Sequence, residues 1–153
     1  MTNIFLLDLI PLQDAKQSSE YKNEGCAPDK CSASAAIDDN LNTEAITLRD
    51  QWEWWSAQLS QRALIHKIYI YPHKNSLDRG YYNRFSVETN DNGGWTVCKR
   101  EHKMEYPYNP HILECETLRI AKYIRLSVRG GGALQLLEVK VFGTPYQGKI
   151  FLL

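Results

Sequence analysis

The residues with the clearest chemical potential form an acidic turn, Asp38-Asp39-Asn40, with Asn42 close behind. Calcium takes about six to eight oxygen ligands, which it draws from carboxylates, amides and backbone carbonyls, and a tight acidic turn presents several of them at once. The same residue types also form Asx turns, in which the side chains bond nearby backbone N–H groups. Spacing alone therefore leaves two interpretations open, a structural calcium site and an Asx turn that ends a helical turn.

A second group of reactive side chains lies in segment 72–84, PHKNSLDRGYYNR. A connection of this length between two strands is unusual for a simple turn, and loops on a rigid scaffold often carry binding residues. Cations and hydroxyl groups beside aromatic rings suit sugar hydroxyls or anionic glycans. The alternative is a solvated loop whose charges serve solubility. The candidate ligand-binding residues of this segment are His73, Lys74, Arg79, Tyr81 and Arg84.

The tryptophans of the segment WEWW at 52–55 could serve either a core or a ligand. The adjacent pair Trp54 and Trp55 needs one buried and one half-buried environment, so we predict a structural role for both. Tryptophan is also a common sugar platform, because its flat apolar face stacks on the C–H face of a pyranose. Trp52 is compatible with either role.

Four cysteines occur as two local pairs, which predicts two disulfides in an oxidising compartment. CxxxxC is not a usual zinc half-site and no matching histidine pair follows it, so a zinc site is disfavoured. Four free buried thiols remain the alternative. The pairs are Cys26 with Cys31 and Cys98 with Cys115.

Composition indicates one folded domain without a strong electric field. The chain has 153 residues, of which 43% are hydrophobic, and its 18 basic residues balance 18 acidic ones. Recognition of nucleic acid or of an acidic membrane therefore has no global electrostatic support. No stretch reaches the roughly 20 apolar residues of a membrane span. The N-terminal run lacks the basic start and small-residue cleavage site of a signal peptide, which leaves open a mature or excised domain, a truncated sequence and a protein that stays inside the cell.

The elements that must position these residues are short strands. Apolar residues recur with a period of two in segments bounded by Gly, Pro, Asn or Asp, and NDNGG at 90–94 is typical of a hairpin turn. Helical turns are expected only at Ser34–Asp38 and Thr117–Ala121. Many short strands with so little helix predict an all-β sandwich or barrel. The expected strands are Leu64–Tyr71, Phe85–Thr89, Trp95–Lys99, Tyr123–Val128 and Leu134–Phe142.

Four fragments, in this order and at these distances, resemble the discoidin or coagulation-factor type C domain and, within it, the fucose-binding F-type lectins. The resemblance implies a jelly-roll β-sandwich of about eight antiparallel strands, of the galactose-binding-domain-like kind, with ligand-binding loops at one end. It assigns residues 1–143 to the domain, with the N-terminal segment beside the last strand, and 144–153 to a tail. The fragments are AKQSSEY at 15–21, SAAIDDN at 34–40, WEWW at 52–55 and LQLLEVKVFG at 134–143.

The F-type lectin resemblance also implies a structural calcium ion, held by an AIDGN turn and by the Glu of a terminal CEVEV-like strand. Leu137 stands where that strand has a cysteine, so one family disulfide is missing. The segment Cys98–Cys115 resembles the family's disulfide-closed strand pair. The implied metal ligands are Ala35, Asp38, Asn40, Thr47, Leu137 and Glu138.

The family's fucose motif is incomplete in this chain. No histidine lies between Leu41 and Gln51, where Arg49 is the only long cation. Lys74 and Arg79 could stand for the motif's two arginines, but Asp78 directly precedes Arg79 and does not lie between the two. The resemblance therefore supports the fold more strongly than it supports fucose specificity.

Taken with the resemblance, these residues predict an extracellular, calcium-stabilised, lectin-like module that recognises glycans on glycoproteins or cell surfaces. No enzyme is expected, because the chain has neither a nucleophile elbow nor a Gly-rich phosphate loop that leads into a helix. The alternative is a discoidin-type adhesion module that binds protein or phospholipid, in which Tyr81 and Tyr82 would serve as weak membrane contacts. Nucleic acid is not an expected partner.

Overall fold

The computed structural model describes residues 7–26, 31–73, 82, 84–102 and 110–148. These residues form nine strands and two short 3-10 helices, so the fold is mostly β as predicted. No helix among them is long and apolar enough to cross a membrane. The elements are β1 (Asp8–Ile10), β2 (Leu12–Gln17), η1 (Glu24–Cys26), η2 (Ala33–Ile37), β3 (Ala45–Ile46), β4 (Trp52–Pro72), β5 (Phe85–Asn90), β6 (Trp95–His102), β7 (His111–Glu114), β8 (Ile120–Arg129) and β9 (Gln135–Pro145).

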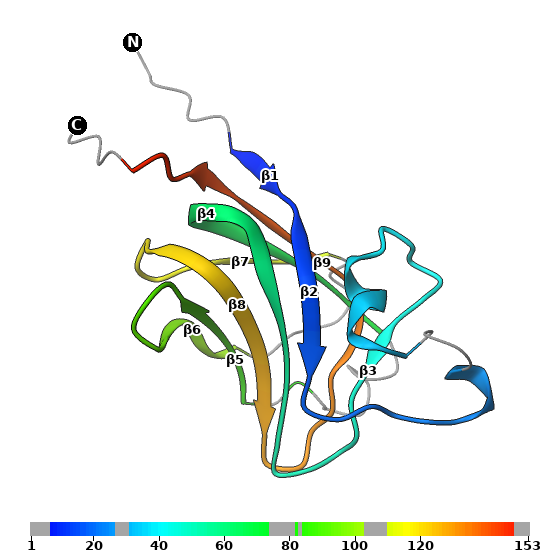
Figure 1. Cartoon of the computed structure of the whole chain (residues 1–153). Coiled ribbons are helices and arrows are strands. Elements are labelled where there is room, and N and C mark those ends of the chain that lie inside the picture. The colour runs from blue at the N-terminus through cyan, green and yellow to red at the C-terminus, as the bar shows by residue number, and fades with distance from the viewer. Residues whose placement is uncertain (1–6, 27–30, 74–81, 83, 103–109, 149–153) are drawn as a thin grey trace.

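Strand β4 organises the jelly roll, because it pairs with four other strands along its length. Its first half pairs with β2 and β8, and its second half pairs with β7 and β9, all antiparallel. Register shifts between Gln58 and Ala63 let this long strand bend from one side of the sandwich to the other. Figure 1 shows β4 curving across the molecule, with β8, β5 and β6 following on one side.

The two ends of the described chain lie side by side, because β1 pairs with β9. This pairing confirms the expected neighbourhood of the N-terminal segment and the last strand. Strand β9 continues through Thr144 and Pro145, which the tail was expected to contain, and Pro145 is the register partner of Ala63.

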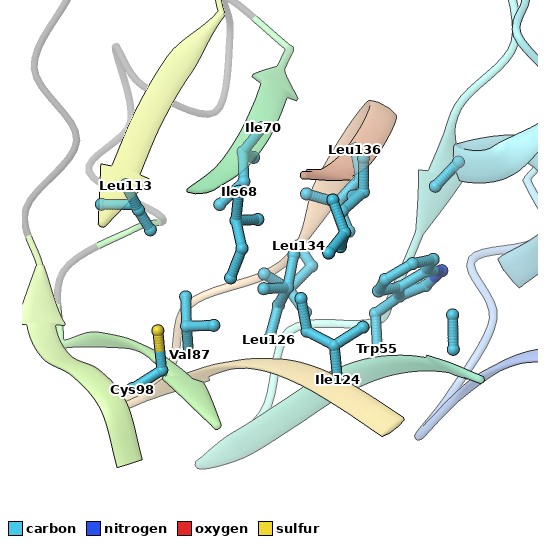
Figure 2. Close-up of a cluster of buried hydrophobic side chains, with 14 of the residues drawn as sticks. Trp55, Ile68, Ile70, Val87, Cys98, Leu113, Ile124, Leu126, Leu134 and Leu136 are labelled. Atoms are coloured by element: carbon cyan, nitrogen blue, oxygen red, sulfur yellow. The ribbon is translucent and has the colours of Figure 1, made fainter. Parts of the chain in front are cut away.

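The core consists of side chains that alternate along the strands and point between the two sides of the sandwich. In Figure 2, Trp55 lies at one end of this cluster and Leu113 and Cys98 lie at the other. Trp55 is completely buried, and its indole N–H donates to the Ala33 carbonyl at 2.9 Å. Trp54 lies on the opposite face of β4 and is half-buried. The predicted division of the adjacent pair into a buried and a half-buried ring is therefore confirmed.

Both predicted disulfides are present, Cys26–Cys31 and Cys98–Cys115. The expected turn at 34–38 is the 3-10 helix η2, and the hairpin joins β5 to β6 through Gly94, whose φ is 110°. The helical turn expected at Thr117–Ala121 is wrong. Ile120 and Ala121 begin strand β8, because they pair with β4 at Leu64 and Ala63.

Candidate ligand-binding end and acidic turn

Helix η2 positions the acidic turn, because three of its alanines are buried and fix the helix to the sandwich. The turn then leaves the helix through Asp38 and through Asp39, whose φ is 58°. Asn40 N–H donates to Asp38 Oδ1 at 3.0 Å, and Asn42 N–H donates to Asn40 Oδ1 at 2.9 Å. The Asx-turn interpretation of this segment is therefore correct at the level of hydrogen bonding.

Three oxygen atoms of the turn converge on the Thr43 hydroxyl. Thr43 Oγ1 lies 3.5 Å from the Ala35 carbonyl oxygen, 3.0 Å from the Asn40 carbonyl oxygen and within hydrogen-bonding distance of Asp38 Oδ2. A hydroxyl has a single hydrogen to donate. Three acceptor oxygens therefore share one donor at this turn.

Glu138 closes the site from strand β9. Its side chain is buried, and Oε2 accepts the Asp39 N–H at 3.0 Å. Burial, followed by the nearby Asp38 carboxylate, raises the pKa of Glu138 to about 7. Lys140 offsets part of this charge from the solvent side, where its Nζ lies 3.1 Å from Asp39 Oδ1. The raised pKa reflects a buried carboxylate that lies near other acidic groups.

The remaining two residues of the implied metal set have other surroundings. Thr47 Oγ1 donates to the Leu48 carbonyl at 2.9 Å and accepts the Leu134 N–H at 3.0 Å, so this side chain anchors the following loop to the start of β9. Leu137 is half-buried and precedes Glu138 in β9. Within the described part of the chain, no three His, Cys, Asp or Glu side chains form a metal cluster. A calcium ion at the acidic turn would therefore depend on backbone and amide oxygens as much as on carboxylates.

Two of the predicted ligand-binding arginines lie at one glycine turn, Gly130–Gly131. Arg49 Nε donates to the Gly131 carbonyl. Side-chain atoms of Arg84 lie 3.9 Å from the position that a Cβ of Gly130 would occupy. This turn follows β8 at the end of the molecule where β4 begins, at the bottom of Figure 1. Segments that are distant in sequence therefore place two guanidinium groups at the same surface.

His73 lies directly after β4, and its backbone N–H donates to the Gln135 carbonyl at 3.0 Å. The three other predicted ligand-binding residues, Lys74, Arg79 and Tyr81, lie outside the described residues.

Tyr82 is buried, and its hydroxyl donates to the Gln135 carbonyl at 2.6 Å. The expectation that Tyr82 could contact a membrane is therefore wrong, because its ring belongs to the core.

Two functional candidates were missed or left undecided by the sequence. Trp52 is 38% exposed, and the guanidinium carbons of Arg125 and Arg129 lie 5.3 and 5.2 Å from its ring centroid. Glu44 has a buried carboxylate oxygen, Oε2, without a hydrogen-bond partner. Burial raises the pKa of Glu44, whereas the nearby His73 lowers it. The sequence left the role of Trp52 open and gave no signal for Glu44, because the surroundings of both depend on contacts between distant segments.

One surface hollow lies beside the acidic turn and another lies at the β5–β6 hairpin. The first, of about 280 Å³, is lined by residues that include Asp39, Glu138 and Lys140. The second, of about 390 Å³, is lined by residues that include Asp91, Gly93 and Arg119. The second hollow contains none of the predicted ligand residues, so volume alone does not locate the site.

The fold and the site together define a class, a jelly-roll β-sandwich whose candidate binding residues lie on loops. The model of the F5/8 type C domain family matches residues 14–139. The chain therefore belongs to the F5/8 type C domain family. No match was found among curated proteins.

Solved structures with this fold include carbohydrate-binding modules and F-type lectins. The family 32 carbohydrate-binding module of C. perfringens NanJ, solved with galactose, has a TM-score of 0.71 at 20% identity and covers 90% of this chain and 99% of its own. A fucolectin from Morone saxatilis (striped bass) serum has a TM-score of 0.70 at 19% identity and covers 93% of this chain and 52% of its own. A fucose-binding module of Streptococcus pneumoniae has a TM-score of 0.67 at 22% identity and covers 86% and 91%. These similarities establish the galactose-binding-domain-like fold.

Proposed function

We propose that this domain is a non-catalytic carbohydrate-binding module whose ligand lies at the Gly130–Gly131 turn. The observation that carries the proposal is the approach of Arg49 and Arg84 to this one turn from two separate segments. Guanidinium groups donate several hydrogen bonds in a fixed geometry, and such charge-assisted bonds suit sugar hydroxyls. The carbohydrate ligands named for structures of the same fold support this assignment.

Calcium serves as a structural ion in this proposal. Ala35, Asp38, Asn40 and Glu138 would hold it, with Thr47 and Leu137 as neighbouring backbone positions. The support is the convergence of three oxygens on Thr43 and the buried charge of Glu138. Bound calcium would neutralise these carboxylates and fix the loop that leads to Arg49.

The setting that we propose is extracellular, where the domain would recognise glycans on glycoproteins or cell surfaces. Two disulfides support this setting, because such bonds persist in oxidising compartments. A shallow site with few anchors binds weakly, so useful avidity would come from oligomers or tandem domains.

A glycan array on the oxidised domain, run with calcium and with a chelator, tests the proposal. We expect selective binding that falls in the chelator and falls in Arg49→Ala. Arg100→Ala is the matched control, since Arg100 is exposed on β6. A blank array from a domain shown to be folded would contradict the proposal, and binding to phosphatidylserine vesicles would then favour the adhesion-module alternative.

A further inference from the structure

The hairpin between β5 and β6 carries the one asparagine of the sequence that a glycine follows, Asn92 before Gly93. The loop residues 91–94 lie between Asn90 and Trp95, which are register partners at the end of the hairpin. Both Asn92 and Gly93 are exposed. Because β6 is the last strand in the sheet order, the loop lies at the edge of the sheet (Figure 1). A loop in this position is open to water and to local changes of conformation.

No hydrogen bond restrains the groups of Asn92 and Gly93 that could react with each other. Among the described residues, neither the Asn92 side-chain amide nor the Gly93 N–H bonds to another residue. A Cβ built on Gly93 would meet no atom within 4 Å, so the space around this backbone is open. Gly94 has a φ of 110°, a conformation that favours glycine, and two successive glycines give the loop conformational freedom. The Asn92 side chain can therefore turn toward the Gly93 nitrogen.

Two other exposed asparagines have restrained side chains. Asn23 Oδ1 accepts the Gly25 N–H at 2.8 Å, and Asn40 Oδ1 accepts the Asn42 N–H at 2.9 Å. Each is followed by a residue with a large side chain, which crowds the next backbone nitrogen. The combination of exposure, an unrestrained amide and a following glycine therefore distinguishes Asn92 from them.

We infer that Asn92 is a site of spontaneous deamidation in the folded domain. The Gly93 nitrogen loses its proton and attacks Cγ of Asn92, which forms a carbon–nitrogen bond and expels the side-chain nitrogen as ammonia. Water then adds to either carbonyl carbon of the resulting cyclic succinimide and breaks the bond from that carbon to nitrogen. The product is aspartate or isoaspartate, in which the backbone runs through the side-chain carbon. The reaction consumes water and releases ammonia, and it requires neither an oxidant nor an enzyme.

The new carboxylate arises in the hollow at the hairpin. Asn92 lines this hollow together with Asp91, Trp95 and Arg119. The preceding residue, Asp91, accepts two hydrogen bonds from the Arg62 guanidinium. Isoaspartate lengthens the backbone beside Asp91, so this ion pair should weaken. Each deamidated molecule also gains one negative charge in a chain whose net charge is zero, which makes the product separable by ion exchange.

The test ages the folded, oxidised protein at physiological temperature over a series of pH values and maps the product by mass spectrometry. Reduction and tryptic digestion at mildly acidic pH, which suppresses deamidation during handling, release a peptide of residues 85–99 that contains Asn90 and Asn92. We expect Asn92 to be converted with time, whereas Asn90, which is half-buried in β5 and precedes an aspartate, keeps its amide. The rate should rise with pH, because the Gly93 nitrogen attacks in its deprotonated form. Labelling by protein isoaspartyl methyltransferase should reveal the isoaspartate.

Gly93→Ala is the matched control, because it keeps Asn92 and adds a methyl group where no atom lies within 4 Å. This variant should lose most of the conversion, since the methyl group hinders attack by the neighbouring nitrogen. Equal conversion in Gly93→Ala and wild type would overturn the inference. Retention of Asn92 in the aged, folded wild type would also overturn it, and the free peptide of residues 85–99 shows whether the conditions allow the reaction. Thermal unfolding confirms that both proteins remain folded, and the wild-type result does not depend on the variant.

Discussion

Glu138→Gln should stabilise the calcium-free domain at high pH, because it removes a buried charge without removing the hydrogen-bond acceptor. The pKa of Glu138 rises from 4.5 to about 7 in the folded domain. Each pKa unit corresponds to about 1.4 kcal/mol, so ionised Glu138 costs the folded state roughly 3 kcal/mol relative to the unfolded chain. The glutamine Oε1 can still accept the Asp39 N–H that now bonds Glu138 at 3.0 Å.

The sign of the pH dependence follows from proton binding. Between pH 4.5 and about 7 the folded state holds a proton on Glu138 that the unfolded state has released. The free energy of unfolding therefore falls as pH rises through this window and levels off above it. Glu138→Gln should lack this fall and should be more stable than wild type by up to about 3 kcal/mol at pH 8.5, with little difference at pH 4.

Urea denaturation at pH 4 and pH 8.5 in a chelator measures the effect. Glu114→Gln is the control, since the Glu114 side chain is 72% exposed and exposed charge pairs contribute little. Adding calcium should reverse the ranking at pH 8.5, because the ion stabilises only the variant that retains the carboxylate. The reasoning fails if Glu138→Gln keeps the wild-type pH dependence in the chelator.

Two further predictions concern stability. Gly143→Ala should lower the free energy of unfolding by at least about 2 kcal/mol, because an added Cβ would lie 2.2 Å from the Leu64 carbonyl oxygen. Gly93→Ala should be nearly neutral, since a Cβ there would meet no atom within 4 Å. Urea denaturation midpoints of the two variants measure the difference, and equal midpoints would contradict the prediction. Replacing Cys98 and Cys115 together by alanine should lower the free energy of unfolding by about 3 kcal/mol, because the disulfide closes a loop with a sequence separation of 17. Thermal unfolding at pH 7 measures the loss, and an unchanged melting temperature would refute the prediction.

The sequence predicted the type of fold and most strands, but it misjudged the extent of β4. The expected strand began at Leu64, whereas β4 begins at Trp52. The intervening SAQLSQRA looks polar, yet Ala57, Leu59 and Ala63 are buried by alternation. Small and polar residues conceal a period of two, because burial of an alanine contributes little to a hydrophobicity pattern.

The orientation of the WEWW segment could not be read from the sequence for a similar reason. Alternation permits either Trp52 and Trp54 or Glu53 and Trp55 to face inward, and hydrophobicity favours the first pair. The structure buries the second pair, because Ser18 and Ser19 both donate to Glu53 Oε2. Hydrogen bonds from the distant residues Ser18 and Ser19 therefore favour the orientation in which Glu53 points inward and Trp52 lies at the surface.

The acidic turn and the Gly130–Gly131 turn are linked through strand β9, which gives the proposed calcium ion a route to the proposed ligand. Glu138 lies in β9, four residues after Leu134, whose backbone is bonded in both directions to Thr47 at 3.0 Å. Thr47 in turn precedes Arg49 by two residues, and Leu134 follows the glycine turn. Loss of a cation at Glu138 would therefore disturb the strand that fixes both sides of the ligand surface. Calcium sensitivity of glycan binding then requires no contact between ion and sugar, and Thr47→Val should weaken that sensitivity even though it leaves every carboxylate in place.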